Sequence, residues 1–383
     1  MKRRDFLKVS LLSLAPSLRA QGAAKPRFLL VFLRGGYDAA NVLVPLSSGF
    51  YYESRPNIAV PREALLPLDA DWGLHPALQD IHALFIKREA AFIPFAGSED
   101  LSRSHFETQD SIELGQPLAS ARDYRSGFLN RLVGELRSSR AISFTHQLPI
   151  TFRGAAQVAN VAPASLARGG VAPRQAELIA QMYRGDPLGA QVAEGFAVRE
   201  GVMREIGADA SAGRNAPNAR GFEVAARRVA RLMRSEYDLG FVDVGGWDTH
   251  VGEGGANGYL AARLEELGRG VAAFADEMGT SWRDSVVVVL SEFGRTFREN
   301  GNRGTDHGHG TAYWVLGGAV RGGRLSGEQA RLERGALFQD RDYPVLNEYR
   351  ALLGGLFARL YGLGGAELER VFPGAAPRDL GLI

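Results

Sequence analysis

The chain has 383 residues, which is enough for one large α/β domain or two ordinary ones. Its hydrophobic content of 45% and charged content of 23% are typical of a globular protein, and a formal net charge of +2 argues against nucleic-acid or membrane-surface binding. The absence of cysteine excludes disulfides, thiolate nucleophiles and sulfur ligands, so any metal is held by oxygen and imidazole nitrogen.

The first 24 residues have the layout of an export signal. The pair Arg3-Arg4 precedes Phe-Leu-Lys, an apolar stretch covers 9–18, and small residues follow up to Ala24. This apolar stretch is too short to span a bilayer, and the twin arginine indicates the route that exports folded proteins. We therefore expect a signal peptide at 1–24, a mature domain at 25–383, recognition by the twin-arginine export machinery and a periplasmic or secreted location. No later segment reaches the roughly 18 apolar residues of a membrane span, so we expect no stable membrane anchor.

Buried strands alternate with helices along the mature chain. Apolar runs predict strands at 28–33, 90–96, within 142–152, and at 239–244, 285–290 and 312–316. Helical spacing is found at 75–88, 106–114, 258–278 and 346–361, and segment 173–237 is mostly helical. Near-continuous apolar strands separated by helices predict an α/β fold with a mostly parallel central sheet flanked by helices.

Polar clusters directly follow several of these strands. Asp38 follows the first strand, Asp248 and His250 follow a later one, and Glu292 follows the run of four valines. Ligands of open α/β sheets bind beyond the carboxyl ends of the strands, so these groups could converge at one sheet edge. Each also has a simpler interpretation: Asp38 as a turn residue, Asp248 as a helix N-cap, and Glu292 as a partner of Arg295.

The closest grouping of possible metal ligands in the sequence is the glycine-flanked turn at 305–310, which contains Asp306, His307 and His309. A carboxylate and two imidazoles on a turn with glycine flexibility suit a metal site. The alternative is an exposed polar loop whose histidines only form hydrogen bonds. His75, His82 and His146 are interpreted as structural or surface residues.

A hydroxyl nucleophile could come from Ser104. The sequence Ser104-His105-Phe106-Glu107 has the form of a capping box, which predicts a helix that begins at this serine. A helix N-terminus also provides a positive potential that favours an alkoxide and an incoming anion. His105 could be a metal ligand or support one, and Arg34, Arg103 or Arg295 could hold an anion as a bidentate fork. The chain has no Gly-x-Ser-x-Gly elbow, no Gly-x-Gly-x-x-Gly after its first strand and no phosphate-binding loop, which argues against a serine triad or a nucleotide site.

With these residues identified, the chain resembles the bacterial family called domain of unknown function 1501. The segments that carry the resemblance are Phe32–Asp38, Arg103–Asp110, Gly246–His250, Val289–Thr296 and Gly304–Gly310. That family is similar in fold to the alkaline phosphatase and sulfatase superfamily, which implies an alkaline-phosphatase-like α/β domain with one or two divalent metals and a hydroxyl nucleophile.

The resemblance also implies roles by position. Asp38 matches the first-strand metal carboxylate, Ser104 the nucleophile, and His309 the late metal histidine. Asp248 and His250 match the pair after a middle strand. The chain departs from the pattern after the valine strand, where Glu292-Phe293 stands in place of an Asp-His pair. Either Glu292 serves there alone, or Asp306 and His307 supply the pair.

These observations lead to one main hypothesis: an exported, metal-dependent hydrolase of phosphate or sulfate esters, with zinc as the first expectation and manganese, magnesium or calcium as alternatives. Its substrate would be an anionic small-molecule or polymer ester. The expected metal ligands are Asp38, Asp248, His250, Glu292, Asp306, His307 and His309. The alternative is a non-catalytic periplasmic binding or assembly module that keeps a structural metal site.

Overall fold

The structure is a computed structural model of the whole chain. It describes residues 25–137, 139–161, 173–186, 188–189, 192–193, 195–196 and 221–383. The predicted signal peptide at 1–24 lies outside the described residues. None of the helices in the described part of the chain has the length and apolar character needed to cross a membrane.

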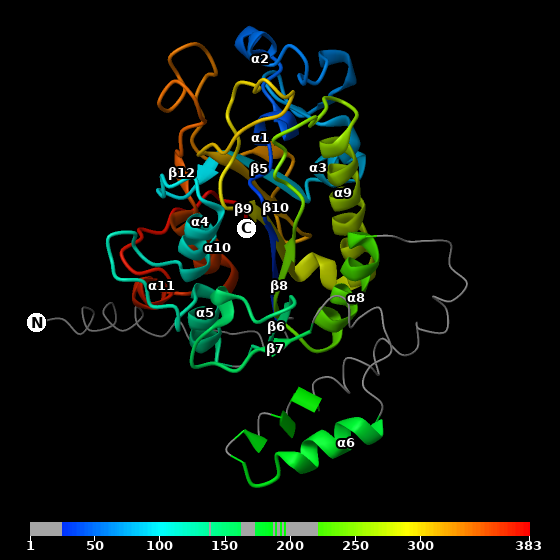
Figure 1. Cartoon of the computed structure of the whole chain (residues 1–383), viewed down its shortest axis with the longest axis vertical. Helices are drawn as coiled ribbons and strands as arrows, with labels where there is room; N and C mark the ends of the chain where they lie inside the picture. The colour runs from blue at the N-terminus through cyan, green and yellow to red at the C-terminus, as the bar shows by residue number, and fades with distance from the viewer. Residues whose placement is uncertain are drawn as a thin grey trace, which may run out of the picture.

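A twisted sheet forms the centre of the molecule (Figure 1). In the described part of the chain it has nine strands, in the order β11-β5-β10-β9-β1-β8-β6-β7, with β12 also paired to β5. The central strands are β1 (Arg27–Leu33), β5 (Ala90–Gly97), β8 (Leu239–Val244), β9 (Ser285–Ser291) and β10 (Thr311–Leu316). β10 is antiparallel to β5 and β9, whereas the other pairs are parallel. The expected mostly parallel sheet is confirmed.

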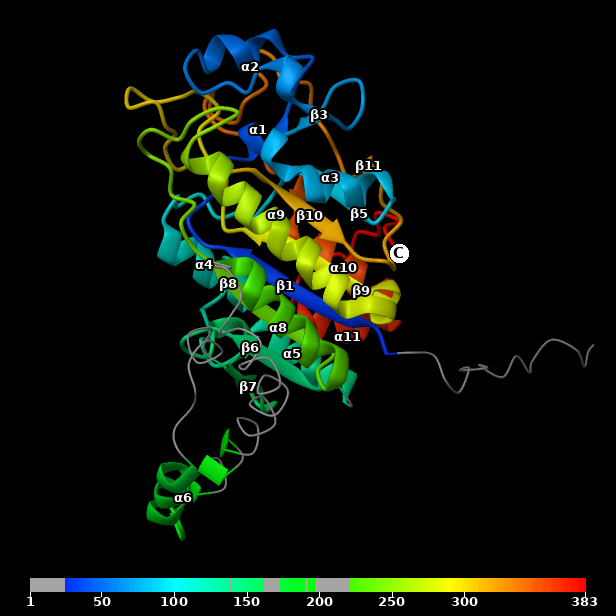
Figure 2. The same ribbon diagram turned by 90° about the vertical axis from the view of Figure 1, so that its right-hand side faces the viewer.

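Helices cover both faces of this sheet, as Figures 1 and 2 show. On one face lie α3 (Gln79–Ile86), α8 (Phe222–Ser235) and α9 (Tyr259–Met278). On the other lie α4 (His105–Leu114), α5 (Phe128–Leu136), α10 (Tyr349–Tyr361) and α11 (Gly365–Val371).

Strand β1 illustrates why two cores form. Alternate side chains of a strand point to opposite faces. Leu29, Val31 and Leu33 therefore join the core beneath α8 and α9. Phe28, Leu30 and Phe32 join the core beneath α5 and α10. Burial on both faces explains why the strand is apolar throughout.

The remaining elements are short or lie at the periphery. The strands are β2 (Leu43–Val44), β3 (Leu66–Pro67), β4 (Gly73–Leu74), β6 (Ala141–Phe144), β7 (Ala159–Asn160), β11 (Arg324–Leu325) and β12 (Asn347–Glu348). The helices are α1 (Ala39–Val42), α2 (Gly49–Ser54), α6 (Pro173–Met182), and the 3-10 turns η1 (Arg62–Ala64), η2 (Pro76–Leu78), η3 (Ile150–Phe152) and η5 (Gly279–Asp284). Of the helical segment predicted at 173–237, α8 covers the sheet, whereas both views show α6 apart from the layers.

The predicted elements mostly agree with the structure. The strand at 239–244 has the expected bounds, and the first, second and valine strands each extend by one residue. The region 142–152 was too broad, because the strand there is only Ala141–Phe144, followed by a loop and the turn η3. The helix expected at 75–88 is shorter as well, because η2 occupies its first turn.

Candidate metal centre

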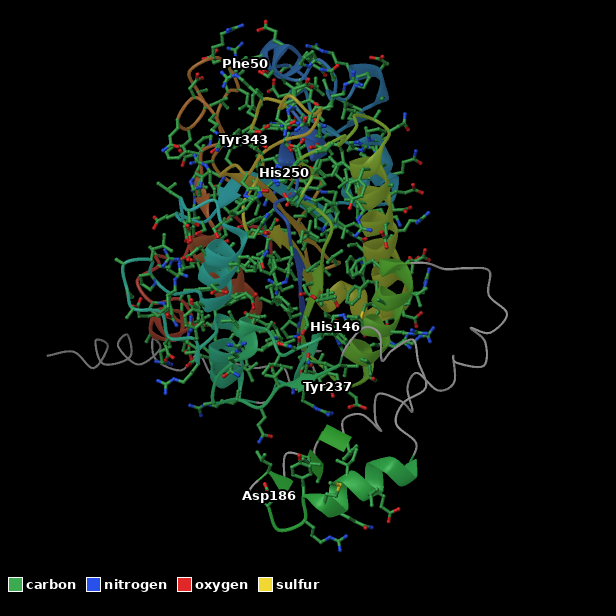
Figure 3. All side chains as sticks on the ribbon, in the orientation of Figure 1. Phe50, His146, Asp186, Tyr237, His250 and Tyr343 are labelled. Atoms are coloured by element: carbon green, nitrogen blue, oxygen red, sulfur yellow. The ribbon has the colours of Figure 1, made fainter. Side chains whose placement is uncertain are left out.

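The carboxyl ends of β1, β5, β8 and β9 lie at the same edge of the sheet, because these strands run in one direction. The loops that follow them carry most of the polar groups noted in the sequence. Figure 3 shows His250 in the upper half of the molecule near the ends of these strands, while His146 lies in the lower half.

Three histidines from three loops have the same hydrogen-bonding pattern at Nδ1. His105 Nδ1 lies 2.8 Å from Glu292 Oε1, and His250 Nδ1 lies 3.0 Å from Asp306 Oδ1. His307 Nδ1 lies 2.9 Å from the carbonyl oxygen of Arg103. Because a carbonyl or carboxylate oxygen only accepts, each Nδ1 must carry the hydrogen. In a neutral ring each Nε2 is then left with a lone pair.

Those three Nε2 atoms converge on the carboxylate of Asp248. His250 Nε2 lies 3.0 Å and His307 Nε2 3.3 Å from Asp248 Oδ1, and the two nitrogens are 3.1 Å apart. His105 Nε2 lies 3.6 Å from Asp248 Oδ2 and is buried without a hydrogen-bond partner. Lone pairs therefore face one another and a carboxylate, which is unfavourable unless a cation lies among them.

The donor atoms fit a small divalent cation. Metal–ligand distances of 2.0 to 2.1 Å in a tetrahedron place ligand atoms about 3.3 Å apart, close to the separations found here. Within the described residues, His105, Asp248 and His307 form a group whose ligand atoms lie within 4.8 Å of one another. Nδ1 atoms held by carboxylates or a carbonyl are also usual for metal-binding histidines.

Asp248 itself is held in its charged form. Burial would raise the pKa of its carboxyl group, but the hydrogen bond and charge of Arg295 together with the charges of His250 and His105 lower the pKa. That bond joins Arg295 Nη1 to Oδ1 at 2.6 Å. An ionised carboxylate is the form that binds a metal.

Glu292 orients His105 and lies behind the donor atoms. Besides His105, its Oε1 accepts from the backbone nitrogen of Gly35 and from Gln109, each at 2.8 Å, and its Oε2 accepts from Ser291 at 2.8 Å. Burial would raise the pKa of Glu292, but His105 and Gln109 lower it. In turn, the hydrogen bond that His105 donates to Glu292 raises the pKa of His105.

Gly35 permits this close approach of the strand ends. Its φ is +126°, and a Cβ would lie 2.8 Å from the backbone nitrogen of Asp248. A side chain there would push the β1 and β8 loops apart.

Asp38 lies behind this cluster in a different environment. Its carboxylate is buried and forms an ion pair with both terminal nitrogens of Arg55, a residue that the sequence analysis did not single out. The backbone nitrogen of Ala40 also donates to it at 3.3 Å. A guanidinium ion thus occupies the position where the resemblance implies a metal.

His309 also lies apart from His250 and His307. Its ring packs against Phe338 with centroids 5.0 Å apart and ring planes tilted by 41°, and burial lowers its pKa to about 4. The two histidines of the 305–310 turn therefore have separate environments, because only His307 points to Asp248.

The three arginines considered for anion binding each contact a carboxylate. Arg34 lies 2.9 Å from Glu113 and 2.7 Å from Asp243. Arg103 lies 2.7 Å from Asp342, and Arg295 holds Asp248.

Ser104 occupies the N-cap position of α4, as expected, but its side chain makes no capping hydrogen bond. The helix therefore begins where it was predicted, but the hydrogen bond that a capping box requires from the Ser104 side chain is not formed. Among the described residues no partner for this hydroxyl is found, and its backbone nitrogen instead donates to Ser102 Oγ at 3.3 Å. Ser104 is half-buried and directly precedes His105.

The other histidines are structural. His75 is buried, with Nε2 3.0 Å from the carbonyl of Gly255, and its Nδ1 accepts from Ala77 at 3.1 Å. His82 Nε2 lies 2.8 Å from the carbonyl of Pro67. The sequence left open whether His105 is a metal ligand or supports one, since its orientation depends on Glu292, which lies 187 positions away.

The fold and donor set define an α/β protein with a histidine–aspartate centre at the carboxyl edge of its sheet. The chain belongs to the family described as "Protein of unknown function (DUF1501)", whose profile matches residues 25–372. No curated protein matches it in sequence.

Solved structures provide a more distant likeness. A protein of the alkaline phosphatase superfamily from Vibrio parahaemolyticus is 13% identical with a TM-score of 0.36, covering 77% of this chain and 60% of that one. The C-terminal periplasmic domain of EcEptC from Escherichia coli, in complex with Zn, is 8% identical with a TM-score of 0.38, covering 77% and 73%. Ps i-CgsB is 12% identical with a TM-score of 0.38, covering 92% and 75%. These similarities are too distant to assign a role to any residue.

Proposed function

We propose that this protein is an exported hydrolase of phosphate or sulfate esters that depends on a divalent metal held by His105, Asp248, His250 and His307. The observation that carries the proposal is the convergence of three Nε2 lone pairs on one ionised carboxylate. Three imidazoles and one carboxylate favour zinc among the divalent cations considered.

Two predicted ligands have supporting roles in this proposal. Glu292 and Asp306 each accept from Nδ1 of a histidine ligand, which fixes the ring and raises the basicity of its Nε2. The carbonyl of Arg103 does the same for His307. The proposal leaves Asp38 and His309 out of the ligand set, because Arg55 and Phe338 are their neighbours.

Ser104 is the proposed nucleophile. Its hydroxyl is without a partner in the described residues, and it lies next to His105 at the N-terminus of a ten-residue helix. The serine oxygen bonds to the phosphorus or sulfur while the bond to the ester oxygen breaks, and the alcohol leaves with a proton. Water then attacks the serine ester, which releases phosphate or sulfate and restores the hydroxyl. A bound divalent cation would supply Lewis-acid stabilisation of the developing negative charge.

Metal analysis and turnover test this proposal together. Purified protein should contain about one zinc equivalent per chain by mass spectrometry and turn over aryl phosphates or sulfates. Asp248→Ala should lose the metal and reduce turnover more than about 100-fold, since a ligand carboxylate is removed. Ser104→Ala should keep the metal but lose turnover.

The control is Asp80→Ala, which removes an exposed carboxylate in the first turn of α3, outside the cluster. It should change neither metal content nor turnover. Bound metal without turnover of any ester would favour the binding or assembly module instead. Equal metal content in Asp248→Ala and the parent protein would refute the centre.

Export is tested separately. Replacement of Arg3 and Arg4 by lysine should keep the protein inside the cell, because the export route reads the arginine pair. The measurement is the share of protein in the periplasmic fraction, and unchanged export would contradict this part of the proposal.

A further inference from the structure

We infer that the centre takes an ester with a single negative charge and an apolar group, in preference to a dianionic phosphate monoester. This inference rests on the proposed function and concerns its substrate class. Its basis is the charge around the histidines and the exposed apolar side chains beside them.

The charged groups around the centre nearly balance. The set consists of Asp248 and of the charged residues that contact Asp248 or one of the three histidines. It also includes Asp342, the carboxylate that two of these residues share. The carboxylates are Asp248, Glu292, Asp306 and Asp342, and the guanidinium groups are Arg103, Arg295 and Arg341.

Four carboxylates and three guanidinium groups leave one net negative charge. A single divalent cation changes this to one net positive charge, which one monoanion neutralises. A dianion would leave the site negative, at an electrostatic cost that a partly buried site does not fully screen. The positive N-terminus of α4 still favours an anion over a neutral ester.

None of these three arginines is free to compensate a second charge. Arg295 holds Asp248 and is fully buried, so it cannot turn toward a ligand. Arg103 and Arg341 share the buried carboxylate of Asp342, at 2.7 Å and 3.1 Å. Burial raises the pKa of Asp342, but both arginines oppose this and keep the group paired.

Exposed apolar side chains lie next to the proposed ligands in the sequence. Phe106 is 83% exposed and directly follows His105, while Val251 is 71% exposed and directly follows His250. Consecutive Cα atoms are 3.8 Å apart, so both begin within a few ångströms of a ligand's backbone. Tyr259 is also exposed, and its hydroxyl donates to the carbonyl of Gly246, two residues before Asp248, at 3.1 Å.

These three residues belong to α4, the loop after β8, and α9, so three separate elements that carry or adjoin the proposed ligands each provide one exposed apolar side chain. Exposed apolar residues that occur singly are ordinary, but a set beside a chemical centre provides a surface for an apolar group. The occupant we infer is the apolar part of the ester itself.

Binding measurements test this inference without turnover. Phenylphosphonate is a dianion at alkaline pH, and its monomethyl ester is a monoanion with the same ring. By calorimetry on the metal-loaded protein, the monoester should bind at least about tenfold more tightly. Phe106→Ser or Val251→Ser should weaken the monoester about tenfold with metal content unchanged, because apolar contact area is lost.

The matched control is Ile86→Ser, which removes a 66% exposed apolar side chain from the end of α3 and should change neither affinity. Tighter binding of the dianion, or unchanged affinity in both serine variants, would overturn the inference while leaving the metal centre and hydrolysis intact. If neither phosphonate binds and no ester is turned over, the proposed function fails as well.

Turnover distinguishes the two sources of a monoanionic ester. Nitrophenyl sulfate, methyl nitrophenyl phosphate and nitrophenyl phosphate share one leaving group. Faster turnover of the sulfate indicates a sulfatase, and faster turnover of the methyl ester a phosphodiesterase. The highest kcat/KM for the dianionic phosphate would contradict the inference.

Discussion

Asp38 and Asp248 follow neighbouring parallel strands at the same edge of the sheet, yet they have opposite environments. Asp248 is partly exposed and faces three imidazole nitrogens, whereas Asp38 is buried and paired with Arg55. Position after a strand therefore does not decide the surroundings of a carboxylate. Both have an arginine partner, but only at Asp248 do the loops also bring three imidazole nitrogens to the carboxylate.

The electrostatics of the two regions differ for the same reason. Burial would raise the pKa of Asp38, but Arg55 outweighs burial and lowers it. The neighbouring Glu253 has no such partner, so burial and the Asp38 charge raise its pKa well above the usual value. Its Oε2 accepts from Thr249 and Thr305, at 2.9 and 2.8 Å. These hydrogen bonds hold Thr249 and Thr305, which are the sequence neighbours of Asp248, His250 and Asp306.

The sharpest test of the contrast is Arg55→Met. Removing one partner of a buried ion pair leaves an uncompensated charge, so the free energy of unfolding should fall by about 3 to 5 kcal/mol. Denaturant unfolding of the metal-free protein measures this loss. The folded variant should still bind one metal.

Arg298→Met is the control, because Arg298 pairs with Asp340 at the surface and should contribute at most about 1 kcal/mol. Equal stability of the two variants would show that the Asp38 region does not support the fold. Loss of metal from folded Arg55→Met would place Asp38 in the metal centre after all.

A smaller effect is expected from Asp306→Ala. Its carboxylate is half-exposed and orients His250, so the variant should weaken metal binding about 10- to 100-fold. Its unfolding in the absence of metal should be nearly unchanged. Competition with a chromogenic chelator measures the affinity. An unchanged metal affinity would remove Asp306 from its supporting role.

The pH dependence of stability separates His309 from the metal centre. A histidine has a pKa near 6.5 when unfolded, and burial lowers that of His309 to about 4. The stability that this neutral ring contributes is therefore fully present above about pH 6.5 and is lost as pH falls toward 4.

Between pH 7 and about pH 4.5 this group should reduce the free energy of unfolding by about 2 kcal/mol in the metal-free protein. His309→Phe keeps an aromatic ring against Phe338 but cannot be protonated, so its loss over the same range should be smaller by that amount. Identical pH profiles for the two proteins would contradict the assigned burial effect.

Much of the architecture could be predicted from the sequence. Uninterrupted apolar runs such as 285–290 identify strands buried on both faces, and the polar residues that follow them identify the functional edge. The turn at 305–310 lies beside another of the predicted site residues, because Asp306 and His307 both contact His250. These are local properties of composition and period.

The allocation of partners was decided only by tertiary structure. Nothing near Asp38 in a motif distinguishes it from Asp248, and Arg55 lies in a segment without any recognised pattern. Glu292, expected as a ligand, instead orients His105, whose Nε2 points to Asp248. The reason is a contact across 187 positions that fixes the imidazole tautomer. His307 and His309, two residues apart, face Asp248 and Phe338 respectively. The sequence determines which residues can donate electron pairs or protons. The paths of the loops over the sheet edge determine which of those atoms lie within about 3 Å of one another, and the chemistry depends on that distance.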